Sequence, residues 1–406
     1  MELNNKKLKI SIVGGSLAGL SAAVSLLKKG FTIIIYEKAD PSRKGGAGLG
    51  LDRSTKDTLS QMGLDTSFLM PMSIEENRDI TGRLLNRDEN IQYFSTYWRS
   101  LYGKLLDAIP KEAILFNNTV IKIDQEGENG IKLWVQNKEG KIFEETTDFL
   151  IAADGINSIV RSYLLGEEEL KYSEYITFRG IIDINDPSTH KFNDDNLKQF
   201  TKKLLMEFKD LGNCLYYNIT DNKTSNCIYM LQEGLINWMW YINKPKPQTE
   251  YLTYVPNEVE LNEFKTSAKL LWNENFNEMI ENTMNPWVNL IVDRDPIDKF
   301  VYGRIVLIGD AAHPARPHRG QATSMAIKDA WTLACALNDL EIDVALNKYD
   351  KLRVPDSKNV VLFSRFLGNL KQGLIHTNIK WSQATKEEAN LCAQNRLFTW
   401  NLSMDK

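Results

Sequence analysis

The feature that most constrains the fold of this chain is a glycine-rich turn close to its N-terminus. Residues 7–13 alternate between polar and apolar and pass into an apolar run, which predicts a strand that ends at Gly14. Apolar residues then recur at helical spacing over 17–27, and Gly30 follows as a stop signal. Residues 31–36 are β-branched and aromatic, which is typical of a buried parallel strand. The segment therefore predicts a βαβ unit at the start of the chain.

The turn itself has the residues that a dinucleotide-binding loop needs. Gly14 and Gly19 stand at the first and third glycine positions of the fingerprint, and Ser16 stands at the second. A small residue there lets the backbone approach a pyrophosphate, whose negative charge is favoured at a helix N-terminus. Glu37 closes the next strand at close to the expected spacing of ~20 residues, where an acid can bind both ribose hydroxyls. Because that acid disfavours a 2′-phosphate, the turn predicts FAD or NAD rather than NADP.

Charge and composition exclude several other classes. The 406 residues include 49 Lys and Arg against 53 Asp and Glu, a formal net charge of −4, which argues against nucleic acid as a partner. The N-terminus lacks the apolar segment of a signal peptide, and no apolar run is long enough to cross a membrane. Four cysteines far apart fit no CxxC pattern, and four scattered histidines add no metal-ligand spacing. We expect a cytoplasmic protein without a metal site.

Two later segments decide which nucleotide is bound. Residues 149–155 form an apolar strand that ends in Asp154-Gly155, and 308–314 read Ile-Gly-Asp-Ala-Ala-His-Pro around Asp310. Together with the first turn, these segments resemble the para-hydroxybenzoate hydroxylase class of FAD-dependent aromatic hydroxylases, over about residues 7–370. The chain looks most similar to the dihydroxypyridine hydroxylase branch. The segments that carry this closer resemblance are 46–51, 96–98, 101–102, Tyr172, 178–180, 237–241 and 316–318.

The resemblance implies an α/β fold with a Rossmann-like FAD-binding domain. We assign the discontinuous segments 1–165 and 300–345 to that domain. The region 166–299 is rich in aromatic and β-branched residues, and it predicts an inserted mixed β-sheet layer that binds the substrate. Residues 346–406 predict a helical C-terminal region, in which Pro355 is expected to break the helix.

The resemblance also implies roles for single residues. Asp310 matches an aspartate that accepts hydrogen bonds from the ribityl chain of FAD, and such bonds are charge-assisted. The match of Pro317 lies beside the isoalloxazine ring, and the free amides of the helix after Gly320 face the flavin pyrimidine edge. Ala322 and Ser324 depart from the glycine and asparagine that are common at the start of that helix. The residues predicted to bind FAD are Gly14, Gly15, Ser16, Leu17, Gly19, Glu37, Lys38, Arg43, Arg99, Asp154, Asp310, Pro317, Gly320, Ala322 and Thr323.

The reaction follows from the same resemblance. NADH or NADPH reduces the flavin, O2 adds to give a flavin hydroperoxide, and a hydroxyl group passes to a small aromatic or heteroaromatic substrate. No second dinucleotide turn is evident, which suits a single-component monooxygenase. His318 is the candidate for acid–base catalysis, because histidine titrates near neutrality, whereas His313 is expected to be structural. The residues predicted to line the apolar substrate pocket are Phe178, Trp238, Trp240 and Tyr241.

Other readings stay open at this point. Epoxidation or Baeyer–Villiger oxidation uses the same scaffold. The segment 238–242 resembles the Trp-x-Trp-x-Ile-Pro signature of flavin halogenases, although Asn243 stands in place of the proline. A flavoprotein that never activates oxygen is a further alternative. The sequence also leaves open the substrate, the choice between NADH and NADPH, and the oligomeric state, including a homodimer.

Overall fold

The chain divides into two compact units, each built from segments far apart in the sequence. The structure, a computed structural model, describes residues 7–42, 46–125, 130–221, 224–375 and 383. The first unit comprises Met1–Ser67, Tyr97–Lys171 and Val292–Arg365. The second comprises Phe68–Thr96, Tyr172–Ile291 and Phe366–Lys406.

A six-stranded sheet with the order β19-β20-β12-β1-β2-β8 forms the centre of the first unit. All neighbours in this sheet are parallel except β19 and β20, which are antiparallel. The central strand β1 is buried along its whole length, as the apolar run at the N-terminus predicts. The strands are β1 (Ile10–Val13), β2 (Ile33–Glu37), β8 (Ile114–Phe116), β12 (Phe149–Ala152), β19 (Val301–Tyr302) and β20 (Ile305–Leu307).

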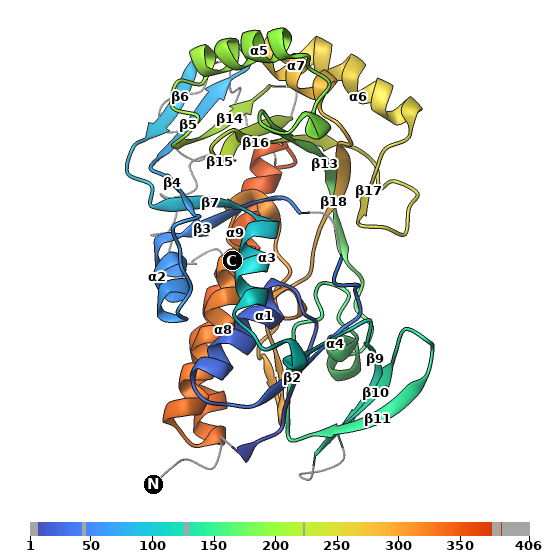
Figure 1. Ribbon diagram of the computed structural model, residues 1–406. Coiled ribbons are helices and arrows are strands. Elements are labelled where there is room, and N and C mark those ends of the chain that lie inside the picture. The colour runs from blue at the N-terminus through green and yellow to red at the C-terminus, as the bar shows by residue number, and fades with distance from the viewer. Residues whose placement is uncertain (1–6, 43–45, 126–129, 222–223, 376–382, 384–406) are drawn as a thin grey trace. The chain divides into compact units, whose positions relative to one another are not determined.

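Helices α1 and α8 pack against each other in the first unit (Figure 1). A small antiparallel sheet with the order β11-β10-β9 completes this unit. The remaining elements of this unit are β3 (Gly48–Asp52), β9 (Thr119–Gln125), β10 (Ile131–Gln136) and β11 (Ile142–Thr147), with α1 (Leu17–Lys28), α2 (Arg53–Gln61), α3 (Trp98–Asp107), α4 (Ile159–Leu165) and α8 (Ala322–Asp339).

An eight-stranded sheet with the order β17-β18-β13-β16-β15-β14-β5-β6 forms the second unit. The pair β5 and β14 is parallel, whereas β13, β16, β15 and β14 follow one another antiparallel. Helices α5, α6 and α7 lie along one face of this sheet (Figure 1). The strands of this sheet are β5 (Ile74–Asp79), β6 (Leu84–Asp88), β13 (Lys171–Asp183), β14 (Cys214–Ile219), β15 (Ser225–Gln232), β16 (Leu235–Asn243), β17 (Thr253–Tyr254) and β18 (Trp287–Asp293). The strands β4 (Met70–Met72) and β7 (Tyr93–Tyr97) belong to a separate small sheet, and the helices of the unit are α5 (Asp194–Glu207), α6 (Glu258–Leu271) and α7 (Glu274–Asn282).

The predicted fold class, α/β with a Rossmann-like domain and a separate mixed sheet, is confirmed. The observed units have other boundaries than the predicted domains. Residues 68–96, which the sequence analysis placed in the first domain, belong to the second unit, because β5 pairs in parallel with β14. No local pattern reveals such a pairing across more than a hundred residues, and the charged sequence of β5, Ile-Glu-Glu-Asn-Arg-Asp, does not look like a buried strand.

The expected break at Pro355 is wrong. Helix α9 runs without interruption over Ile342–Lys371 with this proline inside it. A proline costs a helix one backbone hydrogen bond, but packing can compensate for that loss. Val354 and Val361 are buried on either side, and Arg353 is held by two ion pairs. Apart from Gln383, the segment 376–406 of the predicted C-terminal helical region lies outside the described residues.

Within the described part of the chain, no helix combines the length and apolar character of a membrane span. Among the same residues, no cluster of His, Cys, Asp and Glu side chains has the arrangement of a metal site. The cysteines Cys214, Cys227 and Cys335 are free thiols, and Cys392 lies outside the described residues.

Candidate functional site

The turn after β1 has a geometry that only glycine satisfies at two positions. Gly14 has φ +98°, and a Cβ atom there would lie 2.3 Å from the carbonyl oxygen of Ala153 on the neighbouring strand. A Cβ on Gly19 would lie 1.8 Å from the carbonyl oxygen of Gly14. Helix α1 and the ends of β1 and β12 therefore meet at backbone contact distance.

Backbone amides at this turn are held in place by the carboxylate of Glu37. One of its oxygens accepts a hydrogen bond from the N–H of Gly15, and the other accepts one from the N–H of Ala39 at 2.7 Å. Glu37 is buried, with 6% of its surface exposed. Ser16, the N-cap of α1, makes no side-chain cap, and no acidic residue lies in the first helical turn. The first amides of α1 are thus available to a phosphate, and this end of the helix dipole favours negative charge.

Asp154 follows β12 directly beside this turn, with its Cα 3.0 Å from the position of a Cβ on Gly14. Its Oδ2 accepts a hydrogen bond from the N–H of Val160 at 3.3 Å. Its Oδ1 is buried and has no hydrogen-bond partner within the described part of the protein. Burial raises the pKa of Asp154, and hydrogen bonds from Ser158 and backbone amides oppose that rise. A buried acceptor that the protein does not satisfy is a site for a ligand donor such as a hydroxyl group.

Three residues of the predicted FAD set lie away from the turn or outside the described residues. Lys38 is exposed at the end of β2. Arg99 is exposed on α3, with its guanidinium carbon 5.8 Å from the ring centre of Tyr97. Arg43 lies outside the described residues. The geometry gives Lys38 and Arg99 no defined role.

Asp329 on α8 organises the segment that carries Asp310. Its Oδ2 accepts the N–H of Gly309 at 3.0 Å and lies 2.6 Å from Nε2 of His313, and its Oδ1 accepts Nε of Arg353 at 2.8 Å. Burial alone would raise the pKa of Asp329, but the charges and hydrogen bonds of His313, Arg353 and Gly309 hold this pKa at about 2. His313 is therefore a structural partner of Asp329.

Asp310 is the carboxylate that this arrangement leaves accessible. Its side chain is exposed to solvent, while the residues on both sides of it, Gly309 and Ala311, are buried. The surrounding protein excludes water and so raises the pKa of Asp310, and the nearby His313 lowers it. The carboxylate of Asp310 is thus surrounded by buried residues but still reaches solvent. In this position it can accept hydrogen bonds from the hydroxyl groups of a ligand.

The segment after Asp310 is fastened by a second buried ion pair. Nε of Arg316 donates to Oδ2 of Asp293 at 2.7 Å, and Arg365 on α9 binds the same carboxylate at 2.9 Å. Pro317 is exposed, as expected of a residue beside a flavin ring. His318 is completely buried. Its ring therefore does not reach solvent directly.

Helix α8 begins beside this segment with free backbone amides. Gly320 has φ +60° and turns the chain into the helix, whose N-cap residue Gln321 makes no side-chain cap. Ala322 and Thr323 are half-buried, and the first turn contains no acidic residue. Ser324, which departs from the family pattern, accepts a hydrogen bond from the N–H of Asp52 at 3.3 Å.

Three of the four predicted substrate residues lie in the hydrophobic core of the second unit. Phe178 stacks on Phe264 of α6 with ring centres 4.5 Å apart. Trp238 contacts Phe276 of α7 edge-on and donates to Thr283, and Trp240 donates to Thr224 at 2.7 Å. These side chains pack between the sheet and its helices, so the contacts give no support to a substrate role for them. Core packing of large aromatics is the ordinary outcome on such a strand.

Tyr241 is on the opposite face of the sheet. Several polar and aromatic side chains that the sequence did not single out lie on this face with it. The register sets Thr177 opposite Tyr241 and Arg179 opposite Met239. Cys227 and Tyr217 extend this face across the next two strands. The alternation along 237–241 indicates two faces, but it does not say which face the helices cover.

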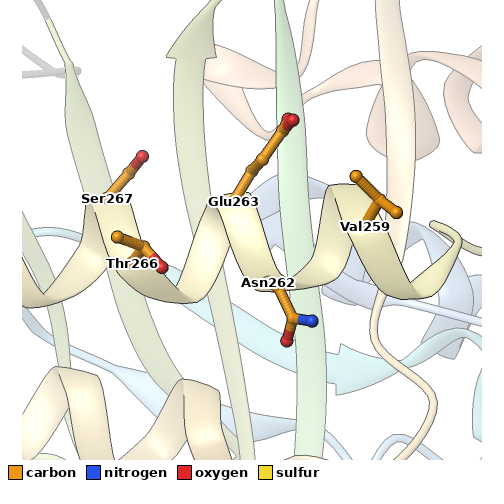
Figure 2. Close-up of a pocket in the computed structure, with 5 residues that line it drawn as sticks. All are labelled: Val259, Asn262, Glu263, Thr266 and Ser267. Carbon is orange, nitrogen blue, oxygen red and sulfur yellow. The ribbon is translucent and has the colours of Figure 1, made fainter.

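A shallow surface pocket on α6 is lined by residues of that single helix (Figure 2). The lining residues are Val259, Asn262, Glu263, Thr266 and Ser267. Among the described residues, its lining comes from this one helix, which distinguishes it from a catalytic or cofactor site, where polar groups from several elements converge.

Comparison with known proteins identifies the family. Residues 7–364 match the family described as "FAD binding domain", and the chain belongs to this family. The protein is therefore an FAD-dependent monooxygenase of the aromatic hydroxylase class, and the predictions of family, cofactor and enzyme class are confirmed.

Three relatives illustrate the similarity. The 2,6-dihydroxypyridine 3-monooxygenase of Paenarthrobacter nicotinovorans is 29% identical and is matched over 80% of this chain and 82% of its own length. A 3-amino-4-hydroxybenzoate 2-monooxygenase of Streptomyces platensis is 26% identical, over 90% of this chain and 89% of its own. The solved structure of 2,6-dihydroxypyridine-3-hydroxylase from Arthrobacter nicotinovorans has a TM-score of 0.76 at 23% identity and covers 90% of this chain and 93% of that one. The last likeness shows the fold.

The residues of the first unit fit FAD. The amides of the Gly14–Gly19 turn suit a pyrophosphate, and the unsatisfied oxygen of Asp154 and the accessible carboxylate of Asp310 suit hydroxyl groups. The free amides at the start of α8 suit an electron-rich ring edge.

We predict that Gly14→Ala weakens FAD binding at least about tenfold. The added Cβ clashes with the backbone of Ala153. In addition, the alanine must adopt the positive φ of Gly14, which costs about 1–3 kcal/mol in strain. FAD affinity is measured by flavin absorbance during titration of the apoprotein, with thermal unfolding in parallel. The matched control is Gly103→Ala inside α3, where a Cβ meets nothing within 4 Å. Unchanged FAD affinity in Gly14→Ala would contradict the assignment.

We predict that Asp329→Asn destabilises the fold by about 3–5 kcal/mol at neutral pH, because it removes the buried carboxylate from Arg353 and leaves this arginine only the exposed partner Asp356. Since the folded pKa of Asp329 is lowered to about 2, its stabilisation is complete above the unfolded pKa of about 3.9 and disappears as the pH falls toward 2. Chemical denaturation of both proteins at several pH values should show the gap closing below pH of about 4. The exposed Asp343→Asn serves as the control, and equal stability of Asp329→Asn and wild type at pH 7 would refute the prediction.

Proposed function

We propose that this enzyme hydroxylates a small aromatic or nitrogen-heteroaromatic ring that already carries a hydroxyl group. The observation that carries the proposal is the uncapped start of α1 together with the accessible carboxylate of Asp310 in the first unit, in a chain of the aromatic hydroxylase family. The names of two relatives support the substrate class, since both act on a hydroxylated six-membered ring.

Bound FAD would accept electrons from NADH or NADPH and use O2 to oxygenate the ring. The protein's part is to hold and orient this group. In our proposal, the amides of the Gly14–Gly19 turn bind the pyrophosphate. Glu37 accepts hydrogen bonds from hydroxyl groups of the ribose, and Asp310 accepts them from the ribityl chain. Asp154 accepts a hydrogen bond from a hydroxyl group of FAD beside the turn. The amides of Ala322 and Thr323 face the ring edge, where their dipoles stabilise negative charge.

The second unit, in this proposal, supplies the substrate-binding surface. Its sheet face with Tyr241 and Arg179 carries aromatic and polar groups together, the combination that positions a flat polar ring. The acid–base role of His318 stays a prediction. We also propose a cytoplasmic location, which the free thiols and the need for NADH or NADPH support; fractionation of cells that produce the protein tests it.

The decisive experiment is the absorbance spectrum of the purified protein, followed by NADH and NADPH oxidation with a panel of phenols and hydroxypyridines. We expect bound flavin, oxidation that accelerates with one class of ring, and a product that gains one oxygen atom derived from ¹⁸O2. Conversion of a ketone to an ester would identify Baeyer–Villiger oxidation instead of ring hydroxylation. Conversion of an alkene to an epoxide would identify epoxidation. Reduction of the flavin without ring-dependent oxygen uptake would refute the oxygenase proposal.

We predict that Glu37→Gln weakens FAD binding about ten- to a hundredfold, which corresponds to about 1.5–3 kcal/mol for a hydrogen bond to a charged group. The amide loses the charge and turns a donor toward one of the N–H groups of Gly15 and Ala39. Equilibrium titration with FAD measures the change, and the exposed Glu112→Gln in the same unit is the control. Identical retention of FAD by Glu37→Gln and wild type would remove Glu37 from the binding set.

A further inference from the structure

One face of the eight-stranded sheet brings together two buried cations from distant parts of the chain. The register places five residues in a row across β5, β14, β15, β16 and β13. In order, the row is Asn77, Tyr217, Cys227, Met239 and Arg179. Helices α6 and α7 cover the other face, where Phe178 and Trp238 lie.

Lys371, at the end of α9, lies over one part of this row. Its Nζ is 3.5 Å from the ring centre of Tyr217, and its side chain is fully buried. This Nζ has no hydrogen-bond partner within the described part of the protein. A buried ammonium group with three unused donors carries a large desolvation cost that an oxygen ligand would offset.

Arg179 lies at the other end of the row. Its Nη2 donates to Oδ1 of Asn237 at 3.2 Å, and its guanidinium carbon is 5.4 Å from the ring centre of Trp287. Its Nε has no partner among the described residues. Burial lowers the pKa of Arg179, which means that its surroundings disfavour the positive charge.

The charges on this face do not balance. Glu75 is a buried carboxylate here and accepts a hydrogen bond from Asn77 at 3.1 Å, while Asp79 further along β5 is occupied by Arg83. Of the described carboxylates that are buried on this face, Asp79 is paired with Arg83, so Glu75 stands against the two buried cations Lys371 and Arg179. A ligand with one negative charge would neutralise the remainder.

Apolar side chains separate the two ends of this row. Tyr217 and Arg179 are separated by three strand spacings, about 14 Å between backbones. The side chains of Cys227 and Met239 lie between them and form an apolar floor. Thr177, on the same face, has a buried hydroxyl group without a hydrogen-bond partner among the described residues. Apolar atoms in the middle and unsatisfied polar atoms at the margins suit a flat ring with oxygen substituents.

We propose that this face binds an aromatic substrate with an anionic oxygen, which Lys371 recognises by a charge-assisted hydrogen bond, while Arg179 binds a second oxygen substituent of the ring. The inference rests on the proposed function and deepens it, since it names the charge of the substrate. Lys371 is then the residue that determines specificity for the anion.

The test compares matched acids and neutral analogues on the FAD-loaded enzyme. The pairs are 3-hydroxybenzoate and 6-hydroxynicotinate with their methyl esters, and 4-nitrophenol, measured where it is ionised, with 4-nitroanisole. Dissociation constants are obtained from changes in flavin absorbance and tryptophan fluorescence. We expect at least one anion to bind about tenfold or more tightly than its neutral partner. The first two pairs report a carboxylate, and the third reports a phenolate.

In Lys371→Met, we expect the anion to lose about ten- to a hundredfold in affinity while the neutral partner changes less than about threefold. The matched control is Lys202→Met on the exposed side of α5. Glu75→Gln is a second variant that removes the competing negative charge, so it should bind the anion more tightly. No preference for an anion in any pair, or an unchanged preference in Lys371→Met, would overturn the proposal.

The same samples separate this proposal from the proposed function. Binding that prefers the anion without transfer of oxygen to any ring refutes the hydroxylase proposal and leaves the anion site intact. Hydroxylation without a preference for the anion supports the hydroxylase proposal and refutes the anion site.

Discussion

The carboxylate of Asp329 connects three parts of the first unit that are distant in sequence. It binds the backbone of Gly309, the ring of His313 and the guanidinium of Arg353, and it lies on the helix whose free amides begin at Ala322. Because each oxygen has a fixed partner, the helix start and the strand end that carries Asp310 are held in one geometry. A cofactor that must contact both elements then meets donors and acceptors that need no rearrangement.

A different constraint shapes the second unit, where a single sheet has two unlike faces. The face toward α6 and α7 is filled by large aromatic side chains, whose polar atoms are satisfied by Thr224 and Thr283. The other face holds Arg179 and Lys371 with incomplete hydrogen bonding. In our proposal, the alternation of side chains along the strands thus separates stability from recognition. A substrate site can vary on one face without disturbing the core on the other.

Much of the cofactor site could be predicted because its signals are local. Gly14 and Gly19 are required by backbone contacts within one turn, and Glu37 reaches that turn from the adjacent strand. The prediction of a break at Pro355 was wrong, and the observed units place residues 68–96 elsewhere than the predicted domains do, because distant partners decide both features. Strand β5 pairs with a segment far along the chain, and the helix around Pro355 is held by the packing and ion pairs of its neighbours.

The sequence by itself determined the family, the FAD cofactor and the Rossmann-like fold, because these depend on short motifs with a defined spacing. Only the tertiary structure decided which face of the second sheet is covered by helices. It also decided that Trp238 and Trp240 belong to the core and that Lys371 lies over Tyr217. Alternation divides a strand into two faces, but the burial of each face depends on which distant elements pack against it.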